Sequence, residues 1–445
     1  MELAGKNFLV IGLARTGCAC ARFLARRGAG VLVNDRRPAA ELADEIGSLR
    51  DLAIRYRLGA EELAWLNDID CVVPSPGVAP ENRLLREACA RGIPVWSEIE
   101  LAYRFFGAPI IAVTGTNGKS TTTSLIGAML EAAGRRVFTG GNLGAPFIGA
   151  AGQNWDWGVL EISSFQLEWT DIFRPRIAVL LNVTEDHLDR YPSFAAYRAA
   201  KERIFKAQTV EDTAILNRDE PAVWQMHERI AARVVSFGVS PAAAGVSARP
   251  DEIVWRDGES NEERYSLARV KLQGVHNVEN MMAAVAATKA AGLENSIIQR
   301  TLENFPGLEH RLEFVREKNR VRYFNDSKGT NVGAVVKSLA SFDGPVILLA
   351  GGVDKGGDYA PLAEAVRRKV RRLVLFGTAK EIIAGALGSQ TETILVDDLE
   401  AALRDAAAHA QSGDVVLLSP ACSSFDQFRN YAERGKFFKR LVQQL

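Results

Sequence analysis

A chain of 445 residues exceeds the usual length of one domain, about 100–200 residues, so we expect two to four domains. Its 47% hydrophobic content is ordinary for a folded protein. Lysine plus arginine and aspartate plus glutamate both total 54, so no net charge favours nucleic acid or anionic lipid, and we expect no nucleic-acid partner. The five cysteines lack paired zinc or redox spacing, and the first apolar run is too short for a signal segment or a span. These features predict a cytoplasmic protein without membrane insertion.

The first hundred residues alternate short β-rich runs with helical stretches, which predicts a small parallel α/β domain. We expect strands at 7–12, 31–35 and 71–74, and a helix at 18–27. The turn at 12–17 follows the first strand and opens the helix, as in a nucleotide-binding βαβ unit. Ala14 stands where a dinucleotide site carries its second glycine. A tight turn without a ligand is therefore an equal alternative, and a nicotinamide-dependent oxidoreductase is disfavoured.

Several residues near this turn have the chemistry to hold a diphosphate. Asp35 ends the second strand. Arg15, Arg36 and Arg37 bring positive charge to the same region, although surface arginines are more often simply solvated. The run Ser75–Gly77 is in the same way a turn first and a site second.

A second α/β segment begins with a strand at 109–114 that runs into the loop Gly115–Ser120 and then into a helix at 121–133. Backbone N–H groups of such a loop cradle phosphate, Lys119 can neutralise the β and γ oxygens, and Ser120 can ligate Mg²⁺. The full phosphate-loop spacing places a glycine where this chain has Val113, so the loop is a shortened relative. A chance turn of the same sequence is the alternative.

The rest of the chain continues the α/β pattern. Strands at 158–162 and 177–182 and a helix near 197–205 predict a mostly parallel sheet, with irregular or hairpin structure at 239–264. After a helix at 277–290, Pro306 and Gly307 mark a boundary. Beyond it, another doubly wound sheet is expected from strands at 346–350, 372–376 and 414–418 and helices near 361–368 and 399–408.

Four further residues are candidates for metal or substrate contacts. Glu161 ends a hydrophobic strand, where an open α/β sheet lines its ligand crevice, although a solvated strand-end glutamate is the alternative. Asn142 fits a turn as well as a site. His187 lies in the ligand-rich run 182–189, yet an isolated histidine is more often structural. Lys201 on a helix is usually solvated, and a protonated ammonium cannot bind a metal.

Taken together, five segments occur in the order typical of Mur ligases, and the sequence resembles that family over all three regions. The segments are Gly115–Thr121, Leu160–Glu168, Asn182–Asp189, His276–Asn280 and Asn325–Asn331. The run Leu418–Phe428 resembles the C-terminal signature of the D-glutamate-adding branch. The Asp-Asn-Pro-Arg motif of the diaminopimelate-adding branch does not occur in the sequence.

The resemblance implies an α/β fold of three domains. They are an N-terminal Rossmann-like UDP-binding domain at 1–97, a central P-loop-type mononucleotide-binding ATPase domain at 98–306, and a C-terminal Rossmann-like, amino-acid-binding domain at 307–445. The implied activity is ATP-dependent addition of D-glutamate to UDP-N-acetylmuramoyl-L-alanine through an acyl phosphate, in peptidoglycan precursor synthesis. We expect Mg²⁺ as a cofactor and a monomeric enzyme.

The resemblance also implies roles for single residues. Catalysis is assigned to Lys119, Glu161, His187 and Lys201, and metal binding to Ser120, Glu161, His187 and Lys201, where Lys201 matches the family's carbamoylated lysine. ATP binding is assigned to Gly115, Thr116, Asn117, Gly118, Lys119, Ser120, Thr121, Asn277, Asn280, Arg311 and Asp326. The UDP-linked substrate is assigned to Arg15, Thr16, Asp35, Arg36, Arg37, Ser75, Gly77, Asn142, Ser163, Gln166 and His187. D-glutamate is assigned to Thr330, Lys355, Ser424 and Tyr431, the last in place of the family's phenylalanine.

Two other functions stay open. A related amide ligase, such as a folylpolyglutamate synthase or a Mur ligase with another acceptor, is disfavoured by the N-terminal site and the C-terminal signature. A nucleotide-regulated binding protein would turn over ATP without regard to the UDP-linked substrate or D-glutamate.

Overall fold

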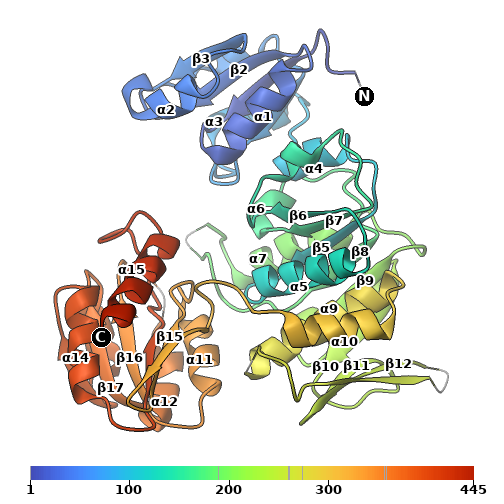
Figure 1. The fold of residues 1–445 in the computed structure, drawn as a ribbon. Coiled ribbons are helices and arrows are strands. Elements are labelled where there is room, and N and C mark those ends of the chain that lie inside the picture. Colours follow the sequence, from blue (N-terminus) through green and yellow to red (C-terminus); the bar gives the residue numbers. More distant parts are fainter. Residues whose placement is uncertain (1, 189, 259–260, 273, 355, 357) are drawn as a thin grey trace. The chain divides into compact units, whose positions relative to one another are not determined.

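The structure is a computed structural model that describes residues 2–188, 190–258, 261–272, 274–354, 356 and 358–445. These residues form three sheets, each accompanied by helices (Figure 1). The first two sheets belong to one compact unit, Met1–Leu267 with Asn280–Leu302, and the third belongs to a second unit, Ala268–Glu279 with Glu303–Leu445. This is the three-sheet α/β architecture that the sequence predicts.

The N-terminal sheet is entirely parallel, with strand order β3-β2-β1-β4. Its strands are β1 (Asn7–Ile11), β2 (Gly30–Asp35), β3 (Ile54–Leu58) and β4 (Cys71–Pro74), and its helices are α1 (Arg15–Ala25), α2 (Ala43–Gly47) and α3 (Arg83–Ala90). Helix α1 begins three residues before the predicted start, because Ala14 is still extended and the chain turns into the helix directly after it. The apolar pattern that places helices in a sequence misses this first turn, which is polar and partly exposed.

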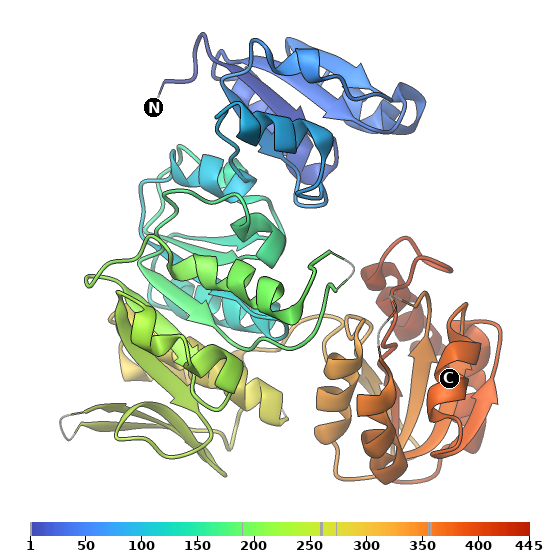
Figure 2. The same ribbon diagram turned by 180° about the vertical axis from the view of Figure 1, so that it is seen from behind.

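The central sheet has nine strands in the order β13-β12-β11-β10-β9-β8-β5-β7-β6. Its strands are β5 (Ile110–Thr114), β6 (Val137–Gly141), β7 (Trp157–Glu161), β8 (Ile177–Leu180), β9 (Thr213–Asn217), β10 (Arg233–Gly238), β11 (Ala244–Arg249), β12 (Glu252–Asp257) and β13 (Glu262–Ser266). Its helices are α4 (Glu98–Tyr103), α5 (Lys119–Ala132), α6 (Ser164–Leu167), α7 (Phe194–Glu202), α8 (Pro221–Trp224), α9 (Val275–Ala290) and α10 (Asn295–Asn304). Helix α5 lies in front of the sheet in Figure 1 and α7 in front of it in Figure 2, so helices cover both faces.

Strands β6 to β11 pair in parallel, which confirms the mostly parallel sheet. The region predicted as hairpin or irregular structure forms β11, β12 and β13, an antiparallel extension of the same sheet. The N-terminal and central sheets share one apolar core, in which the Phe23 ring of α1 meets Phe105 edge-on at 5.3 Å between centroids. These two sheets are therefore packed together rather than joined only by the chain.

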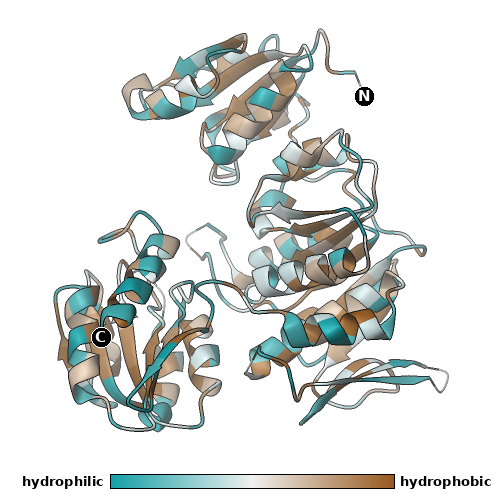
Figure 3. Cartoon of the chain, in the orientation of Figure 1, coloured by the Kyte–Doolittle hydropathy of each residue, from teal (hydrophilic) through white to brown (hydrophobic). Residues whose placement is uncertain are grey.

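The C-terminal sheet has the order β14-β15-β19-β16-β17-β18, and every pair except β14 with β15 is parallel. Its strands are β14 (Glu313–Lys318), β15 (Val321–Asn325), β16 (Val346–Gly351), β17 (Val370–Phe376), β18 (Glu392–Leu395) and β19 (Val415–Leu418). Its helices are α11 (Val332–Ala340), α12 (Ala360–Lys369), α13 (Lys380–Leu387), α14 (Leu399–His409) and α15 (Tyr431–Gln444). Figure 3 shows apolar strands between helices with polar outer faces, as a sheet buried on both faces requires.

The β14–β15 hairpin was not predicted, because its turn residues Asn319 and Arg320 adopt positive φ without a glycine to mark the turn. In the described ranges, no helix combines the length and apolar character needed to cross a membrane.

Candidate active site

The loop Gly115–Ser120 follows β5, which lies between β7 and β8 in the central sheet. Strand order reverses there, and ligands of open α/β sheets bind at the carboxyl ends of strands at such a point. Gly118 has φ +87 and directly precedes α5, so Lys119 and Ser120 form the first turn of the helix. The predicted helix start at 121 was therefore two residues late.

Asn182 and Thr184, which follow β8, hold this loop in place. The Asn182 side chain accepts a hydrogen bond from the Asn117 N–H at 2.9 Å and donates one to the Asn117 carbonyl at 3.1 Å. The Asn182 carbonyl accepts from the Thr116 N–H at 2.9 Å. The Thr184 N–H donates to Thr116 Oγ1 at 3.1 Å. The loop is thus fixed by the protein itself, a role for Asn182 that the sequence did not reveal.

Two lysines converge on the loop. Lys119 Nζ donates to the carbonyl oxygens of Gly115 and Thr116 at 2.8 and 2.9 Å. Lys201 Nζ, from α7, donates to the same Gly115 oxygen at 2.9 Å and is buried. Burial and the nearby charge of Lys119 hold the pKa of Lys201 well below its ordinary value, with only partial opposition from Asp186 and Glu161. Lys201 is therefore a buried amine that loses its proton more readily than the solvated lysine that the sequence alone would suggest.

Glu161 ends β7, where its strand register places it beside Val113 of β5. The Asn142 side chain donates to Glu161 Oε1 at 2.6 Å, so two predicted site residues from neighbouring strand ends meet here. Glu161 and the Ser120 hydroxyl are both buried. A carboxylate and a hydroxyl at a phosphate site suit Mg²⁺, which prefers oxygen ligands and takes others from substrate phosphates. Within the described residues no three or more His, Cys, Asp or Glu side chains gather into a metal-binding group.

His187 lies on the loop after β8 with φ +55, a backbone conformation uncommon for a residue other than glycine. Its ring meets Phe165 edge-on, with centroids 4.8 Å apart, and its side chain is 41% exposed. Tyr197 of α7 lies next to it and forms a hydrogen bond of 3.3 Å between its hydroxyl and Thr116 Oγ1. An accessible imidazole is thereby held close to the phosphate loop.

Helix α9 brings Asn280 to the phosphate loop. The Asn280 Oδ1 atom lies 3.3 Å from the Thr122 hydroxyl of α5. A Cβ atom added at Gly118 would lie only 2.2 Å from the same oxygen. Asn277, the other predicted base contact, lies one helical turn earlier on α9 and is buried.

Residues at the carboxyl ends of β1 and β2 enclose a cavity of about 250 Å³ in the N-terminal domain. The predicted residues Asp35, Arg36 and Gly77 line this cavity. Glu61 and Asn82 line it as well, although no sequence pattern marks them as site residues. Glu61 Oε1 accepts hydrogen bonds from Arg36 Nε at 2.8 Å and from Asn82 Nδ2 at 2.7 Å, so the cavity wall is a connected polar surface.

The other N-terminal candidates lie near the turn at 12–17, between β1 and α1. Burial opposes ionisation of Asp35, but hydrogen bonds from Arg37 and from the Leu13 N–H hold its pKa below the ordinary value. Ser75 Oγ donates to the Gly12 carbonyl at 2.8 Å. Arg15 and Thr16 form the first turn of α1.

Glu98, at the start of α4, is a buried carboxyl that the sequence does not mark as a site residue. Its Oε1 atom accepts a hydrogen bond from the Ile148 N–H at 2.6 Å, and Arg15 and Gln166 are close enough to stabilise its charge. Burial nevertheless raises the pKa of Glu98 to about 7. The sequence around Glu98 suggests only an acidic residue at the N-terminus of a helix, so no local pattern marks Glu98 as a site residue. Gln166 also accepts from Ser163 in a capping box at α6, which joins two predicted substrate residues.

The remaining ATP candidates, Arg311 and Asp326, belong to the second unit. Burial raises the pKa of Asp326, while hydrogen bonds of 2.7 Å from Ser419 and Ser338 and the charge of Arg311 oppose the shift. Arg311 Nε is buried and has no hydrogen-bond acceptor among the described residues. A half-buried guanidinium with a donor to spare fits an anionic ligand.

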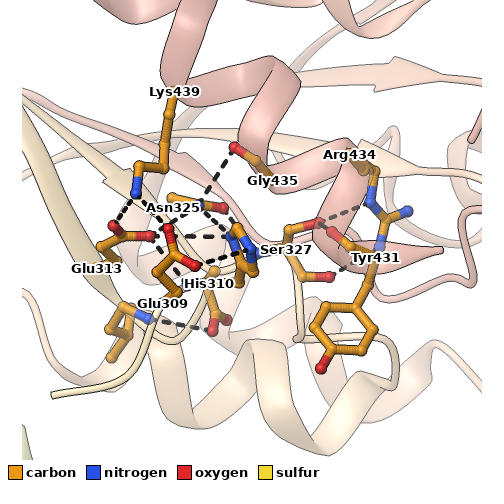
Figure 4. A network of polar contacts seen from close by, with 11 residues as sticks. Glu309, His310, Glu313, Asn325, Ser327, Tyr431, Arg434, Gly435 and Lys439 are labelled. Atoms are coloured by element: carbon orange, nitrogen blue, oxygen red, sulfur yellow. Dashed lines mark hydrogen bonds and ion pairs between the residues drawn. The ribbon is translucent and has the colours of Figure 1, made fainter.

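Three D-glutamate candidates come from neighbouring segments of the second unit. Thr330 follows β15, Ser424 follows β19, and Tyr431 begins α15. The Ser327 hydroxyl donates to the Tyr431 carbonyl at 2.8 Å (Figure 4). The fourth candidate, Lys355, lies outside the described residues.

Arg434 joins these segments, although the sequence does not mark it as a site residue. Its fully buried guanidinium donates to Ser327 Oγ at 3.0 Å and to the Ser327 carbonyl at 2.9 Å (Figure 4). It also donates to the Cys422 carbonyl at 3.2 Å. Burial lowers the pKa of Arg434 to about 10. Beside it, Lys439 pairs with Glu309 and Glu313.

Comparison with known proteins places this arrangement in a family. The profile described as Mur ligase MurD-like, N-terminal domain matches residues 6–97, Mur ligase middle domain matches 113–288, and Mur ligase, glutamate ligase domain matches 310–422. A UDP-N-acetylmuramoylalanine--D-glutamate ligase of Geotalea uraniireducens is 51% identical over 100% of this chain and 99% of its own length. A protein of the same name from Geobacter metallireducens is 50% identical, with the same coverage.

The chain belongs to the Mur ligase family.

Solved structures agree with this fold. This Mur ligase resembles a pseudomurein peptide ligase type C from Methanothermus fervidus, with a TM-score of 0.63 and 18% identity. The match covers 99% of this chain and 100% of the other. It resembles a MurF ligase from Thermotoga maritima in complex with ADP over 100% of both chains, with a TM-score of 0.62 and 17% identity. At such identities the likeness concerns the fold of the Mur ligase alone.

Proposed function

We propose that this Mur ligase uses ATP to join the carboxylate of UDP-N-acetylmuramoyl-L-alanine to the amine of D-glutamate. The choice of substrates rests on the full-length identity of about one half to proteins named UDP-N-acetylmuramoylalanine--D-glutamate ligase. The phosphate loop with Lys119, Lys201 and Glu161 around it supports the chemistry, because activation of a carboxylate by ATP requires a site for the transferred phosphate.

In the first step, an oxygen of the terminal alanine carboxylate attacks the γ-phosphorus of ATP. The bond from that phosphorus to the β–γ bridging oxygen breaks, which gives an acyl phosphate and ADP. Lys119 is the residue that neutralises the phosphate oxygens, and its present hydrogen bonds to Gly115 and Thr116 keep its ammonium at the loop. Asn280 and Asn277 are proposed to contact the nucleotide base, and Arg311 and Asp326 the phosphates and ribose.

Ser120, Glu161 and His187 are the residues we assign to Mg²⁺, together with Lys201 as a carbamate. Mg²⁺ would neutralise charge that develops on the transferred phosphate. The buried amine of Lys201 suits the modification, because an uncharged amine adds to CO₂ with loss of one proton and becomes an anionic carbamate. This carbamate would give the site the negatively charged oxygen ligands that an ammonium lacks.

In the second step, the D-glutamate amine attacks the carbonyl carbon of the acyl phosphate. A tetrahedral intermediate collapses to the amide with departure of inorganic phosphate, and the amine loses its proton. We assign Thr330, Lys355, Ser424 and Tyr431 to D-glutamate. A lysine partner for a side-chain carboxylate would distinguish glutamate from neutral or basic acceptors.

The N-terminal cavity is proposed to take the uridine diphosphate end of the substrate. Its wall includes Arg36 and Asp35, and Arg15 begins the adjacent helix. Asn142, which follows β6, and Ser163 and Gln166 at the start of α6 would continue the contacts toward the reacting alanine. We further propose that the enzyme acts as a monomer in the cytoplasm, where its five free cysteines would stay reduced.

The proposal is tested by phosphate release from ATP with the purified enzyme. UDP-N-acetylmuramoyl-L-alanine is offered with D-glutamate, L-glutamate, L-lysine or meso-diaminopimelate in separate reactions. We expect turnover only when the UDP-linked substrate and D-glutamate are both present. Stimulation by another amino acid alone would overturn the acceptor assignment, and turnover indifferent to both substrates would identify a nucleotide-regulated binding protein instead.

A further inference from the structure

Arg190 of the central domain reaches a turn of the N-terminal domain. Its Nη1 atom donates to the Pro76 carbonyl at 3.1 Å and its Nη2 atom to the Val78 carbonyl at 3.0 Å. Both carbonyls belong to the turn that contains Gly77, and Gly77 and Val78 line the 250 Å³ cavity. One wall of the N-terminal cavity is therefore held by a side chain from another domain.

The other contacts of Arg190 fix its guanidinium. Its Nε and Nη2 atoms donate to the two carboxylate oxygens of Glu168 at 3.2 and 2.5 Å, and the two side chains are only 10% and 11% exposed. The Tyr191 hydroxyl donates to Glu168 at 2.6 Å. The guanidinium also lies over the Phe165 ring, 4.2 Å from its centroid. A bidentate, stacked arginine of this kind has little freedom to move.

Three segments assigned to the UDP-linked substrate thus meet around one side chain. The first is the turn at 75–77, and the second is the capped helix α6, which contains Phe165 and ends at Glu168. The third is the loop after β8, whose His187 ring packs against Phe165 and which continues directly into Arg190. The hydrogen bonds of Arg190 to Pro76, Val78 and Glu168 and its contact with the Phe165 ring connect these segments.

We propose that Arg190 is a positioning residue that holds the uridine-diphosphate turn in register with the loop carrying His187. The inference rests on the proposed function, in which one substrate molecule spans both places. Arg190 fixes the separation between the pocket for one end of that substrate and the site where its other end reacts. Displacements of about 1 Å at such a site lower rates by as much as about a hundredfold.

A lysine could not replace this arrangement. Its ammonium is a point charge on a flexible stem, whereas the guanidinium binds a carboxylate and two backbone carbonyls in a fixed plane. The competing explanation is that Arg190 and Glu168 only stabilise the packing of two domains. In that case replacing either residue would change the unfolding temperature, and the KM values for ATP and for the UDP-linked substrate would change by the same factor.

The test is Arg190→Lys in the full-length enzyme, assayed by phosphate release while UDP-N-acetylmuramoyl-L-alanine and ATP are varied in turn. We expect KM for the UDP-linked substrate to rise about tenfold or more and KM for ATP to change by less than about twofold. Glu168→Gln keeps the shape of the side chain but removes its charge and one of the two acceptor oxygens, so the same selective rise is expected in smaller measure. This second variant keeps the test open if Arg190→Lys fails to fold.

Arg174→Lys is the matched control. Arg174 Nε donates to the buried carboxylate of Asp212 at 2.6 Å, but this pair precedes β8 and β9 and so lies at the opposite ends of the strands. The KM values of the Arg174→Lys variant should match those of the unmodified enzyme. Equal changes in all KM values, or an effect of Arg190→Lys no different from the control, would overturn the inference. Absence of turnover by the unmodified enzyme would instead refute the proposed function.

Discussion

Lys119 and Lys201 donate hydrogen bonds to the same carbonyl oxygen, that of Gly115, at 2.8 and 2.9 Å. Two ammonium groups so close together repel each other, and Lys201 is the one that is fully buried. The proton is therefore lost more readily from Lys201 than from an ordinary, solvated lysine.

From this relationship we predict that Lys201 carries a carbamate. Enzyme equilibrated with ¹³C-labelled bicarbonate should show a carbamate carbon signal in NMR spectra, and Lys201→Met should abolish both the signal and at least about 99% of the activity. Lys206→Met is a suitable control, because Lys206 lies nearby on the chain and is exposed. A carbamate signal that survives in Lys201→Met would place the modification elsewhere.

A second prediction concerns Gly118. Its φ of +87 disfavours a side chain, and an alanine Cβ would come within 2.2 Å of Asn280 Oδ1. Gly118→Ala should raise KM for ATP about tenfold or more and leave binding of UDP, measured by calorimetry, unchanged. Gly134→Ala has a similar φ of +75 with no neighbouring atom within 4 Å, so it controls for backbone strain alone. Equal KM values for ATP in the two variants would contradict a role for the close approach of Asn280.

Stability should depend on pH through Glu98. The folded-state pKa of about 7 is above the ordinary value of 4.5, so the folded protein binds the proton more tightly than the unfolded chain does. Stability from this group is present below pH 4.5 and is lost as the pH rises toward 7. Glu98→Gln should remove the loss, with a gain in the free energy of unfolding of up to about 3 kcal/mol at pH 8 and little change at pH 4.5.

Thermal unfolding of both proteins across this pH range measures the effect of Glu98. The groups that face the carboxyl include Arg15 and the Cys20 thiol, whose pKa is itself raised by burial and by Glu98. A difference in unfolding temperature that is the same at pH 4.5 and pH 8 would show that Glu98 does not titrate in this range.

Arg434→Lys should destabilise the second unit by about 3 kcal/mol, because a lysine ammonium cannot reach the carbonyls of Ser327 and Cys422 together. Arg429→Lys, with a side chain that is 90% exposed, should change stability by less than about 0.5 kcal/mol. Hydrogen exchange measures the effect separately in each unit. In Arg434→Lys, exchange should be faster than in the unmodified protein in the second unit and unchanged in the first. Unchanged exchange near β15 and β19 would contradict the prediction.

The phosphate loop could be predicted from the sequence because its pattern is local: a strand, two glycines, Lys119 and Ser120 follow one another directly. Glu161 and Lys201 became interpretable only through the family resemblance, since each residue type is common at strand ends or on helices. The depressed pKa of Lys201 depends on burial by residues distant in sequence, which no local pattern reports.

Arg190, Arg434 and Asn182 show why other parts of the site could not be predicted. Arg190 binds backbone carbonyls more than 100 residues earlier in the chain, at Pro76 and Val78. Arg434 likewise binds carbonyls near β15 and β19. Every residue has a carbonyl, so acceptors of this kind leave no trace in the amino-acid sequence.

The hydrogen bonds that Asn182 forms with Asn117 and Thr116 have a consequence for the affinity of the nucleotide. Restricting one residue to a single backbone conformation costs about 1–2 kcal/mol of conformational entropy. Because these bonds already restrict the loop in the protein alone, that loss belongs to folding and not to the encounter with ATP. The contacts made by the phosphates are then not reduced by the cost of ordering this loop.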